Sequence, residues 1–193
     1  MPYIGRFAPS PTGPLHFGSL LTAVASYCDA KANHGKWLVR IEDTDIPRIY
    51  PNSEHHIRSC IDAFQFEPDA EIICQKDRLD IYAQVLEQLK HLDAIYACQC
   101  TRKMLGSNHI YVGTCRDLHL DFNNQAIRLK VADQLICFED RLQGQQCSNL
   151  KHDLGDFVLK RRDGIISYQL AVVVDDDLQG ITHVVRGADL LDN

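Results

Sequence analysis

The first part of the chain alternates apolar runs with turn-forming residues in the order expected of an α/β protein. Residues 3–7 predict a short strand, followed over 8–14 by a loop with three prolines, which oppose helix and strand alike. From Gly18, apolar residues recur at helical spacing up to a stop at Gly35. Residues 37–41 then predict a buried strand. A strand, a helix and a strand in this order predict a parallel sheet.

Apolar side chains at helical spacing also predict which helix faces are buried. A second helix is expected from Ser53 and a third from about Asp77. The buried face of the first helix is predicted to consist of Leu20, Leu21, Val24 and Cys28. We expect all three helices to cover a sheet.

The character of the chain changes after the third helix. Residues 93–155 are polar, rich in Gln and Cys, and contain only two short strand candidates, 127–131 and 135–138. We interpret this stretch as an insertion into the α/β fold. It would separate a first half, residues 1–92, from the start of a second half, residues 156–193.

Apolar runs after the insertion predict four more strands. Residues 157–160 and 165–168 flank Asp163 and Gly164, and Asp-Gly between apolar runs is typical of a β-hairpin. The runs 171–174 and 181–185 also indicate strands.

Composition and charge predict a soluble cytoplasmic protein. The chain has 193 residues, 45% hydrophobic and 24% charged, which excludes a disordered chain, a collagen and a coiled coil. Its apolar runs are too short to cross a bilayer, and its N-terminus does not resemble a signal peptide. The net charge of −6 argues against coating nucleic acid through bulk charge but allows a local basic surface. We expect no membrane partner and a monomer.

The eight cysteines fall into two groups. In a cytoplasmic chain they do not indicate disulfides, and five are scattered: Cys28, Cys60, Cys74, Cys137 and Cys147. The spacing of Cys98, Cys100 and Cys115 suits a metal ion, and structural zinc takes four tetrahedral ligands. The fourth place has three candidates: His109, Tyr111 and His119. The alternative is three reduced cysteines without a metal.

The segment RFAPSPTGPLHFGS, from Arg6 to Ser19, carries the clearest chemical signal. It places His16 and Gly18 at a helix N-terminus, where exposed N–H groups and the helix dipole favour a phosphate. His16 can donate to a phosphate oxygen, and Gly18 allows close approach to the backbone. Arg6 ends a predicted strand, where open α/β sheets bind ligands. A purely structural Pro-Gly turn is the alternative.

This segment resembles the first signature of class I aminoacyl-tRNA synthetases in their glutamate-specific form. The match continues with RIEDTD at 40–45, YQLAVVVDD at 168–176 and VRGAD at 185–189. The resemblance implies an α/β, Rossmann-like nucleotide-binding fold split by an insertion, with ATP and Mg²⁺. It implies catalytic roles for His16 and Gly18, and an ATP site at Pro9, Ser10, His16, Gly18 and Ser19. It implies a glutamate site at Arg6, Phe7, Ala8, Pro9, Ser10, Glu42, Tyr168 and Arg186.

The charges of these residues also suit glutamate itself. Arginine forks match carboxylates, so Arg6 and Arg186 can bind the two carboxylates of the amino acid. Glu42 follows a predicted strand and can hold the ammonium, while Tyr168 and Ser10 can supply hydrogen bonds. Surface ion pairs are the alternative for each residue alone.

Within the family, the chain looks closest to a shortened branch that lacks an anticodon-binding domain. The indications are HFGSL at 16–20, the Cys-x-Cys cluster and GADLL at 187–191. Enzymes of this branch activate glutamate and transfer it to queuosine at the wobble position of tRNA(Asp). The resemblance implies one structural Zn²⁺ held by Cys98, Cys100, Tyr111 and Cys115. The alternatives are the catalytic part of an ordinary glutamyl-tRNA synthetase and a non-catalytic RNA- or glutamate-binding remnant.

One part of the family pattern is missing. The Lys-rich KMSKS loop, which holds the pyrophosphate, is not found around any lysine, and GADLL looks like the start of a helix. We therefore expect these residues to be the N-terminal part of an enzyme, truncated before that loop. By resemblance the insertion faces the tRNA, and the candidate phosphate contacts are Arg102, Lys103, Arg116 and residues 160–162.

Overall fold

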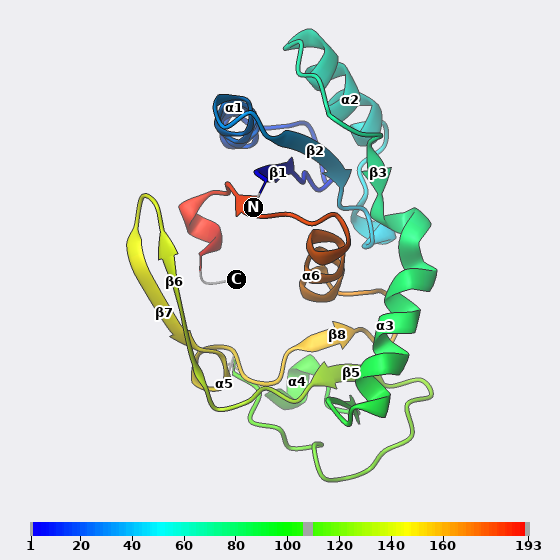
Figure 1. Cartoon of the computed structure of the whole chain (residues 1–193). Helices are drawn as coiled ribbons and strands as arrows, with labels where there is room; N and C mark the ends of the chain where they lie inside the picture. The colour runs from blue at the N-terminus through cyan, green and yellow to red at the C-terminus, as the bar shows by residue number, and fades with distance from the viewer. Residues whose placement is uncertain (1, 106–109, 192–193) are drawn as a thin grey trace. The chain divides into compact units, whose positions relative to one another are not determined.

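A computed structural model of the chain describes residues 2–105 and 110–191 (Figure 1). It contains two compact units. The first combines Met1–Tyr82 with Tyr168–Asn193, and the second is Ala83–Ser167. The division into 1–92, 93–155 and 156–193, made on composition alone, stays a prediction.

The first unit is built on a parallel sheet. Its strands are β1 (Ile4–Phe7), β2 (Lys36–Ile41), β3 (Ile73–Cys74) and β9 (His183–Val184). Its helices are α1 (Phe17–Ala32), α2 (Ser53–Ala63) and α6 (Tyr168–Leu178), with 3₁₀ turns η1 (Ile46–Arg48), η2 (Gln75–Arg78) and η3 (Ala188–Leu190). The strand order is β3-β2-β1-β9, and every pair is parallel. In Figure 1, α1 lies on one side of the sheet and α6 on the other.

The order of the strands reverses at β1. From β1 the chain passes through α1 to β2 and through α2 to β3, moving outward in one direction. The strand that follows α6, β9, pairs with the opposite edge of β1. The carboxyl ends of β1 and β9 therefore flank a topological switch point, where open α/β sheets bind ligands.

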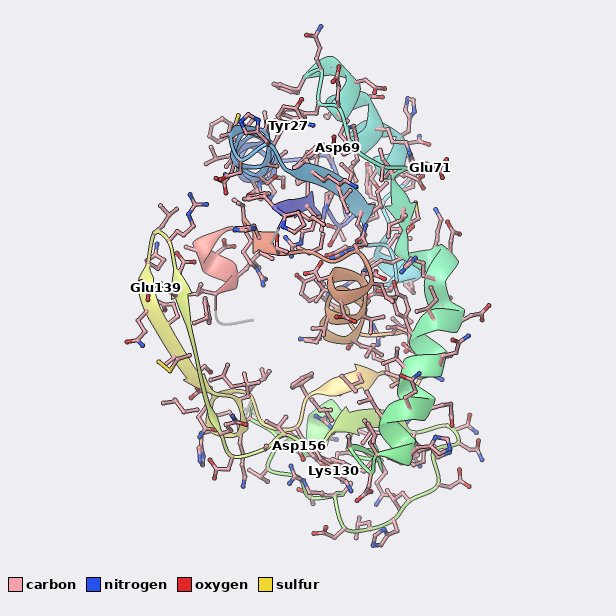
Figure 2. All side chains as sticks on the ribbon, in the orientation of Figure 1. Tyr27, Asp69, Glu71, Lys130, Glu139 and Asp156 are labelled. Atoms are coloured by element: carbon pink, nitrogen blue, oxygen red, sulfur yellow. A yellow bond between two sulfur atoms is a disulfide. The ribbon has the colours of Figure 1, made fainter. Side chains whose placement is uncertain are left out.

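Trp37 is the centre of the first unit's core. Its side chain is fully buried, and Tyr27 meets it edge-on with ring centroids 5.1 Å apart. The indole N–H donates to Ser26 Oγ over 2.9 Å, so the polar atom of this large side chain has a partner. Asp69, labelled with Tyr27 in Figure 2, accepts from the Trp37 backbone N–H at 2.7 Å and from Lys31 at 2.9 Å. These contacts join α1, β2 and the loop after α2.

The predicted buried face of α1 is wrong. Leu21 is 58% exposed, and Val24 and Cys28 are exposed as well. The residues that α1 buries are Ala23, Ser26 and Ala30. Small side chains let the helix lie close to the sheet, and hydrophobicity alone does not detect such a face.

The second unit combines one longer helix with short strands and helical turns. They are α3 (Leu79–His91), whose first turn belongs to the first unit, β4 (Ile95–Cys98), α4 (Arg102–Leu105), β5 (Ala126–Leu129), β6 (Leu135–Asp140), β7 (Gly144–Asn149), α5 (Leu150–Asp153) and β8 (Val158–Lys160). An antiparallel sheet has the order β4-β5-β8, and β6 and β7 form a separate hairpin.

A buried carboxylate organises the second unit. Asp156, labelled in Figure 2, is 2% exposed and accepts from the Tyr96 hydroxyl at 2.7 Å and from the Val131 N–H at 2.9 Å. Arg116 forms an ion pair with the same carboxylate. Burial opposes the charge, but Arg116 and Tyr96 outweigh it, so the pKa of Asp156 is lowered.

The strand predicted at 171–174 is wrong, and the strand predicted at 165–168 is shorter than expected. Residues 171–174 lie inside α6, and Tyr168 begins that helix rather than ending a strand. The predicted hairpin around Asp163 and Gly164 is present in short form: Lys160 bridges Ile166, and the N–H groups of Arg161 and Ser167 donate to the carbonyls of Ile165 and Leu159. The run of three valines in α6 favours a strand locally, but the helix buries Leu170, Ala171 and Val174.

The prediction that no cysteines pair is also wrong. Cys137 and Cys147 form a disulfide across the β6–β7 hairpin, where they are direct cross-strand partners. Their Cα atoms are 4.1 Å apart, a separation that the antiparallel register brings about and that sequence spacing does not reveal. Among the described residues, no helix is both long and apolar enough to span a bilayer.

The Trp37–Ser26 hydrogen bond provides a test of this core. Ser26→Ala would leave the buried indole N–H without an acceptor and lower the free energy of unfolding by about 1–3 kcal/mol. The fluorescence of the single tryptophan reports the denaturant midpoint directly. Thr22→Ala removes a solvent-exposed hydroxyl contact from the same helix and serves as the control. Equal midpoints for the two variants would contradict this account.

Candidate functional site

A cavity of about 710 Å³ lies at the carboxyl ends of the parallel strands in the first unit. Its walls come from the segments that follow β1, β2 and β9 and from the start of α6. The predicted glutamate- and ATP-site residues all line it: Arg6, Phe7, Ala8, Pro9, Ser10, His16, Gly18, Ser19, Glu42, Tyr168 and Arg186. Parallel pairing explains the gathering, because strands that run the same way end at one edge of the sheet.

His16 caps the N-terminus of α1. Its Nδ1 accepts from the Ser19 backbone N–H at 3.2 Å, so a neutral ring carries its proton on Nε2. Nε2 lies 3.2 Å from Ser19 Oγ, and the side chain is exposed to the cavity. A Cβ at Gly18 would come within 3.0 Å of the His16 ring, so glycine leaves the ring room. The helix start thus presents a ring N–H donor beside the first turn of α1.

Two arginines face the cavity with different partners. Arg6 is 6% exposed and donates to Asp176 through Nε and Nη2 at 3.4 Å each. Arg186 Nη2 is buried and has no hydrogen-bond partner among the described residues. A buried guanidinium N–H without an acceptor is costly, and an anionic ligand would satisfy it.

Glu42 supplies a carboxylate to the same cavity. It is 9% exposed, and Arg40 Nη2 donates to its Oε1 at 3.1 Å. Burial raises the pKa of Glu42 to about 7, and the positive charges of Arg40 and Arg6 hold it from rising further. Tyr168 lies close enough to interact with this charge; burial and then Glu42 raise the pKa of its phenol.

Two buried groups that the sequence reasoning did not single out stand behind this cavity. Arg40 is fully buried and pairs with Asp176 at 2.7 Å, and Asp175 is fully buried against Tyr82. Neither Arg40 nor Asp175 lines the cavity. Arg40 and Asp175 both belong to the motifs quoted above. Their pairing requires Asp175 and Asp176 to lie on a helix, whereas the sequence predicted a strand at 171–174.

The second unit holds a cluster of sulfur atoms. Ligand atoms of Cys98, Cys100 and Cys115 lie within 4.8 Å of one another. The Tyr111 hydroxyl lies 3.3 Å from Cys98 Sγ and 3.4 Å from Cys100 Sγ, and Cys100 Sγ lies 3.5 Å from Cys115 Sγ. Tetrahedral zinc with ordinary bond lengths separates ligand atoms by roughly 3.5–3.8 Å. The four side chains therefore fit one zinc ion.

The fourth member of this cluster is a tyrosine and not a histidine. His119 is exposed and outside the cluster, while His109 lies outside the described residues. Gly155 has φ +72°, and a Cβ there would come within 2.4 Å of the Tyr111 carbonyl, so glycine allows the bridge that places Tyr111. The Arg128 guanidinium lies 3.8 Å from the centre of the Tyr111 ring. Burial, followed by the neighbouring thiols, raises the pKa of the Tyr111 phenol.

The thiols of the cluster differ in acidity. Burial opposes the Cys115 thiolate, but hydrogen bonds, first from Tyr111, lower the pKa of Cys115 to about 7. Burial raises the pKa of Cys100. A thiolate available near neutral pH is the form that binds a metal.

The basic residues predicted to contact tRNA phosphates already have partners within the protein in several cases. Arg116 is engaged by Asp156, and Arg162 donates to the Gln99 carbonyl and to Gln125. Arg161 pairs with Asp163. The side chain of Arg102 lies outside the described residues.

Comparison with known proteins identifies the family. A model for the catalytic domain of class I tRNA synthetases (E and Q) matches residues 4–193. The chain belongs to this family. Its mixed α/β fold, with a Rossmann-like parallel sheet, agrees with the expected fold class.

Several members of the class I synthetase family are close relatives. The chain is 80% identical to a glutamyl-Q tRNA(Asp) synthetase of Acinetobacter baylyi over 99% of this chain and 65% of that protein. It is 50% identical to the glutamyl-Q tRNA(Asp) synthetase of Pseudomonas putida over 99% of this chain and 65% of that protein. The chain thus spans just under two thirds of the length of these relatives.

Solved structures of synthetases show the same fold. A glutamate tRNA ligase from Elizabethkingia meningosepticum, solved in complex with its amino acid, superposes with a TM-score of 0.86 and 32% identity. The match covers 99% of this chain and 45% of that chain. A glutamate-tRNA synthetase from Elizabethkingia anophelis gives a TM-score of 0.85 and 31% identity.

Proposed function

We propose that this protein activates L-glutamate with ATP and transfers the glutamyl group to the queuosine base at the wobble position of tRNA(Asp). The relative with 80% identity over nearly the whole chain carries the name of that activity. The observation that carries the proposal is the cavity, which brings two arginines and one carboxylate to the end of a Rossmann-like sheet. That charge set complements the two carboxylates and one ammonium of glutamate.

The roles of the glutamate-site residues follow from their geometry. Arg186 offers an unpartnered Nη2, and Arg6 has only long contacts to Asp176, so both can bind carboxylates of the substrate. Glu42 holds the ammonium. Tyr168 and Ser10 supply hydrogen bonds, while Phe7, Ala8 and Pro9 form the adjoining wall.

The ATP-site residues lie at the start of α1. His16 Nε2–H and the backbone N–H of Gly18 bind phosphate oxygens, next to Pro9, Ser10 and the Ser19 hydroxyl. A glutamate carboxylate oxygen attacks the α-phosphorus in line, and the bond to pyrophosphate breaks. Mg²⁺ bound with ATP would neutralise phosphate charge. His16 and Gly18 are the catalytic positions, because they adjoin the reacting phosphate.

The sulfur cluster has a structural role in this proposal. Cys98, Cys100, Tyr111 and Cys115 hold one Zn²⁺, supported by the separations of their ligand atoms. The second unit has short strands and few buried apolar residues, so a metal would supply part of its folding free energy. The protein acts in the cytoplasm as a monomer, and its zinc-bearing insertion faces the tRNA.

The test of function begins with glutamate binding, measured by calorimetry on this chain. Glutamate is expected to bind, while aspartate and glutamine fail because one shortens the substrate and the other lacks a carboxylate. Arg186→Ala removes the guanidinium and is expected to lower the affinity by at least about tenfold. Arg48→Ala, at an exposed ion pair outside the cavity, should leave binding unchanged. Unchanged affinity for Arg186→Ala would remove this residue from the site.

The same preparation is then assayed for glutamate-dependent ATP–pyrophosphate exchange, with and without tRNA. Exchange without tRNA, followed by labelling of queuosine-containing tRNA(Asp), is the expected result. Exchange only with tRNA(Glu) would favour an ordinary glutamyl-tRNA synthetase. Glutamate binding without exchange in either arm would favour a non-catalytic glutamate-binding module for this chain.

The raised pKa of Glu42 makes glutamate binding depend on pH. An ammonium beside Glu42 favours the carboxylate, so binding near pH 7 should release protons, and the release should fall at pH 8. Below pH 7 the affinity falls as protons compete. Calorimetry in two buffers of different ionisation enthalpy measures the release. Glu42→Gln should abolish it, and equal release from that variant would refute the assignment.

The zinc assignment is tested by metal content. One zinc per chain is expected after purification in metal-containing medium, and Cys98→Ser should lose it together with the stability of the second unit. Cys28→Ser is the matched control, because Cys28 is exposed and outside the cluster. Tyr111→Phe should retain three thiolates but bind zinc more weakly in a chelator competition. Zinc contents that are equal in the Cys98 and Cys28 variants would contradict the site.

A further inference from the structure

A buried guanidinium connects the two charged sides of the candidate glutamate site. Arg40 lies on β2 with its side chain fully buried. Its Nη1 lies 2.7 Å from Asp176 Oδ1, and its Nη2 lies 3.1 Å from Glu42 Oε1. One planar fork therefore fixes two carboxylates that belong to different elements. Only Glu42 of these three residues reaches the cavity.

The second carboxylate passes this constraint on to Arg6. Asp176 accepts from Arg6 Nε and Nη2 at 3.4 Å each, longer than its 2.7 Å contact with Arg40. The shorter contact fixes Asp176, and Asp176 in turn sets the direction of the Arg6 fork. Because its own contacts are long, Arg6 keeps donors for a ligand carboxylate.

Further residues restrain the Arg40 guanidinium on the side away from the cavity. Asp175 Oδ2 lies 3.8 Å from Arg40 Nε and is fully buried. Three donors fix this carboxylate: Gln75 Nε2 at 2.9 Å, Arg78 Nε at 2.8 Å and the Tyr82 hydroxyl at 2.7 Å. Gln179 accepts from Arg40 Nη1 at 2.8 Å. The guanidinium is thus restrained at every nitrogen except Nε, which has no hydrogen bond.

We propose that Arg40 is a positioning residue for the glutamate site, which orients Glu42 directly and Arg6 through Asp176. This inference rests on the proposed function for the identity of the ligand. Arg40 itself does not line the cavity and touches no substrate. Stability alone does not account for the arrangement, since buried ion pairs gain little over apolar packing. A lysine could not replace it, because a single ammonium cannot reach both carboxylates with fork geometry.

The charges around Glu42 give the proposal a specific signature. Glu42 is surrounded by Arg40 on β2, Arg6 on β1, and Asp176 and Tyr168 on α6. Arg40 and Arg6 lower the pKa of Glu42, whereas Asp176 raises it. Removal of Arg40 and removal of Asp176 should therefore shift this pKa in opposite directions. A general loosening of the fold would not produce opposite signs.

The decisive measurement is an NMR titration of the Glu42 carboxyl carbon. In Arg40→Gln the pKa should rise by about one unit, and in Asp176→Asn it should fall. Arg116→Gln is the matched control, because Arg116 pairs with the buried Asp156 of the second unit and contacts neither Glu42 nor Asp176. This control variant should lower the stability of the protein but leave the pKa of Glu42 unchanged. Shifts of one sign in all three variants, or none in Arg40→Gln, would overturn the proposal.

Glutamate affinity supplies the functional readout. Arg40→Lys keeps the positive charge and offers a milder change if Arg40→Gln does not fold. It should weaken glutamate binding by about ten- to a hundredfold and leave ATP affinity unchanged. Wild-type affinity in Arg40→Lys would contradict a positioning role. If the wild-type chain itself does not bind glutamate, the proposed function fails, whereas the opposite titration shifts still show whether Arg40 and Asp176 act on Glu42.

Discussion

Parallel pairing of β1 with both β2 and β9 is the constraint on which the rest of the first unit depends. Because the three strands run the same way, their carboxyl ends meet at one edge, and the residues that follow them line one cavity. Arg6, Glu42 and Arg186 are far apart in sequence but are brought together by this pairing alone. The reversal of strand order at β1 separates the helices onto two faces and leaves the edge open.

An open edge provides proximity but not orientation, and orientation requires charges that do not move. In the candidate site, Arg40 on β2 and Asp175 on α6 provide this orientation. Burying these groups is costly, so each needs several partners, and the partners come from β2, η2, α3 and α6. The geometry of the glutamate site therefore depends on how α6 packs against the sheet. A change that loosens α6 would also change the direction of Arg6.

The sequence predicted those features that depend on local chemistry. The Pro-rich loop, the helix start at His16 and the parallel strands are all present, because turn residues and periodicity act over a few neighbours. It failed where tertiary contacts decide. The valines of α6 favour a strand locally, yet the segment is helical because Asp175 and Ala171 face the interior of the unit. Cross-strand register, which sequence spacing does not contain, pairs Cys137 with Cys147.

The second unit shows the same division between local and tertiary information. Spacing identified its thiols, but the choice of Tyr111 over a histidine came from family resemblance and not from chemistry. The structure shows which contacts place Tyr111: Gly155 lets the Tyr111 backbone approach, and Arg128 lies against the ring. The Tyr111 hydroxyl accepts from the Cys115 backbone N–H at 3.0 Å and lies 3.3 Å from Cys98 Sγ. The approach of Tyr111 to the thiols therefore depends on contacts that the spacing of the cysteines does not reveal.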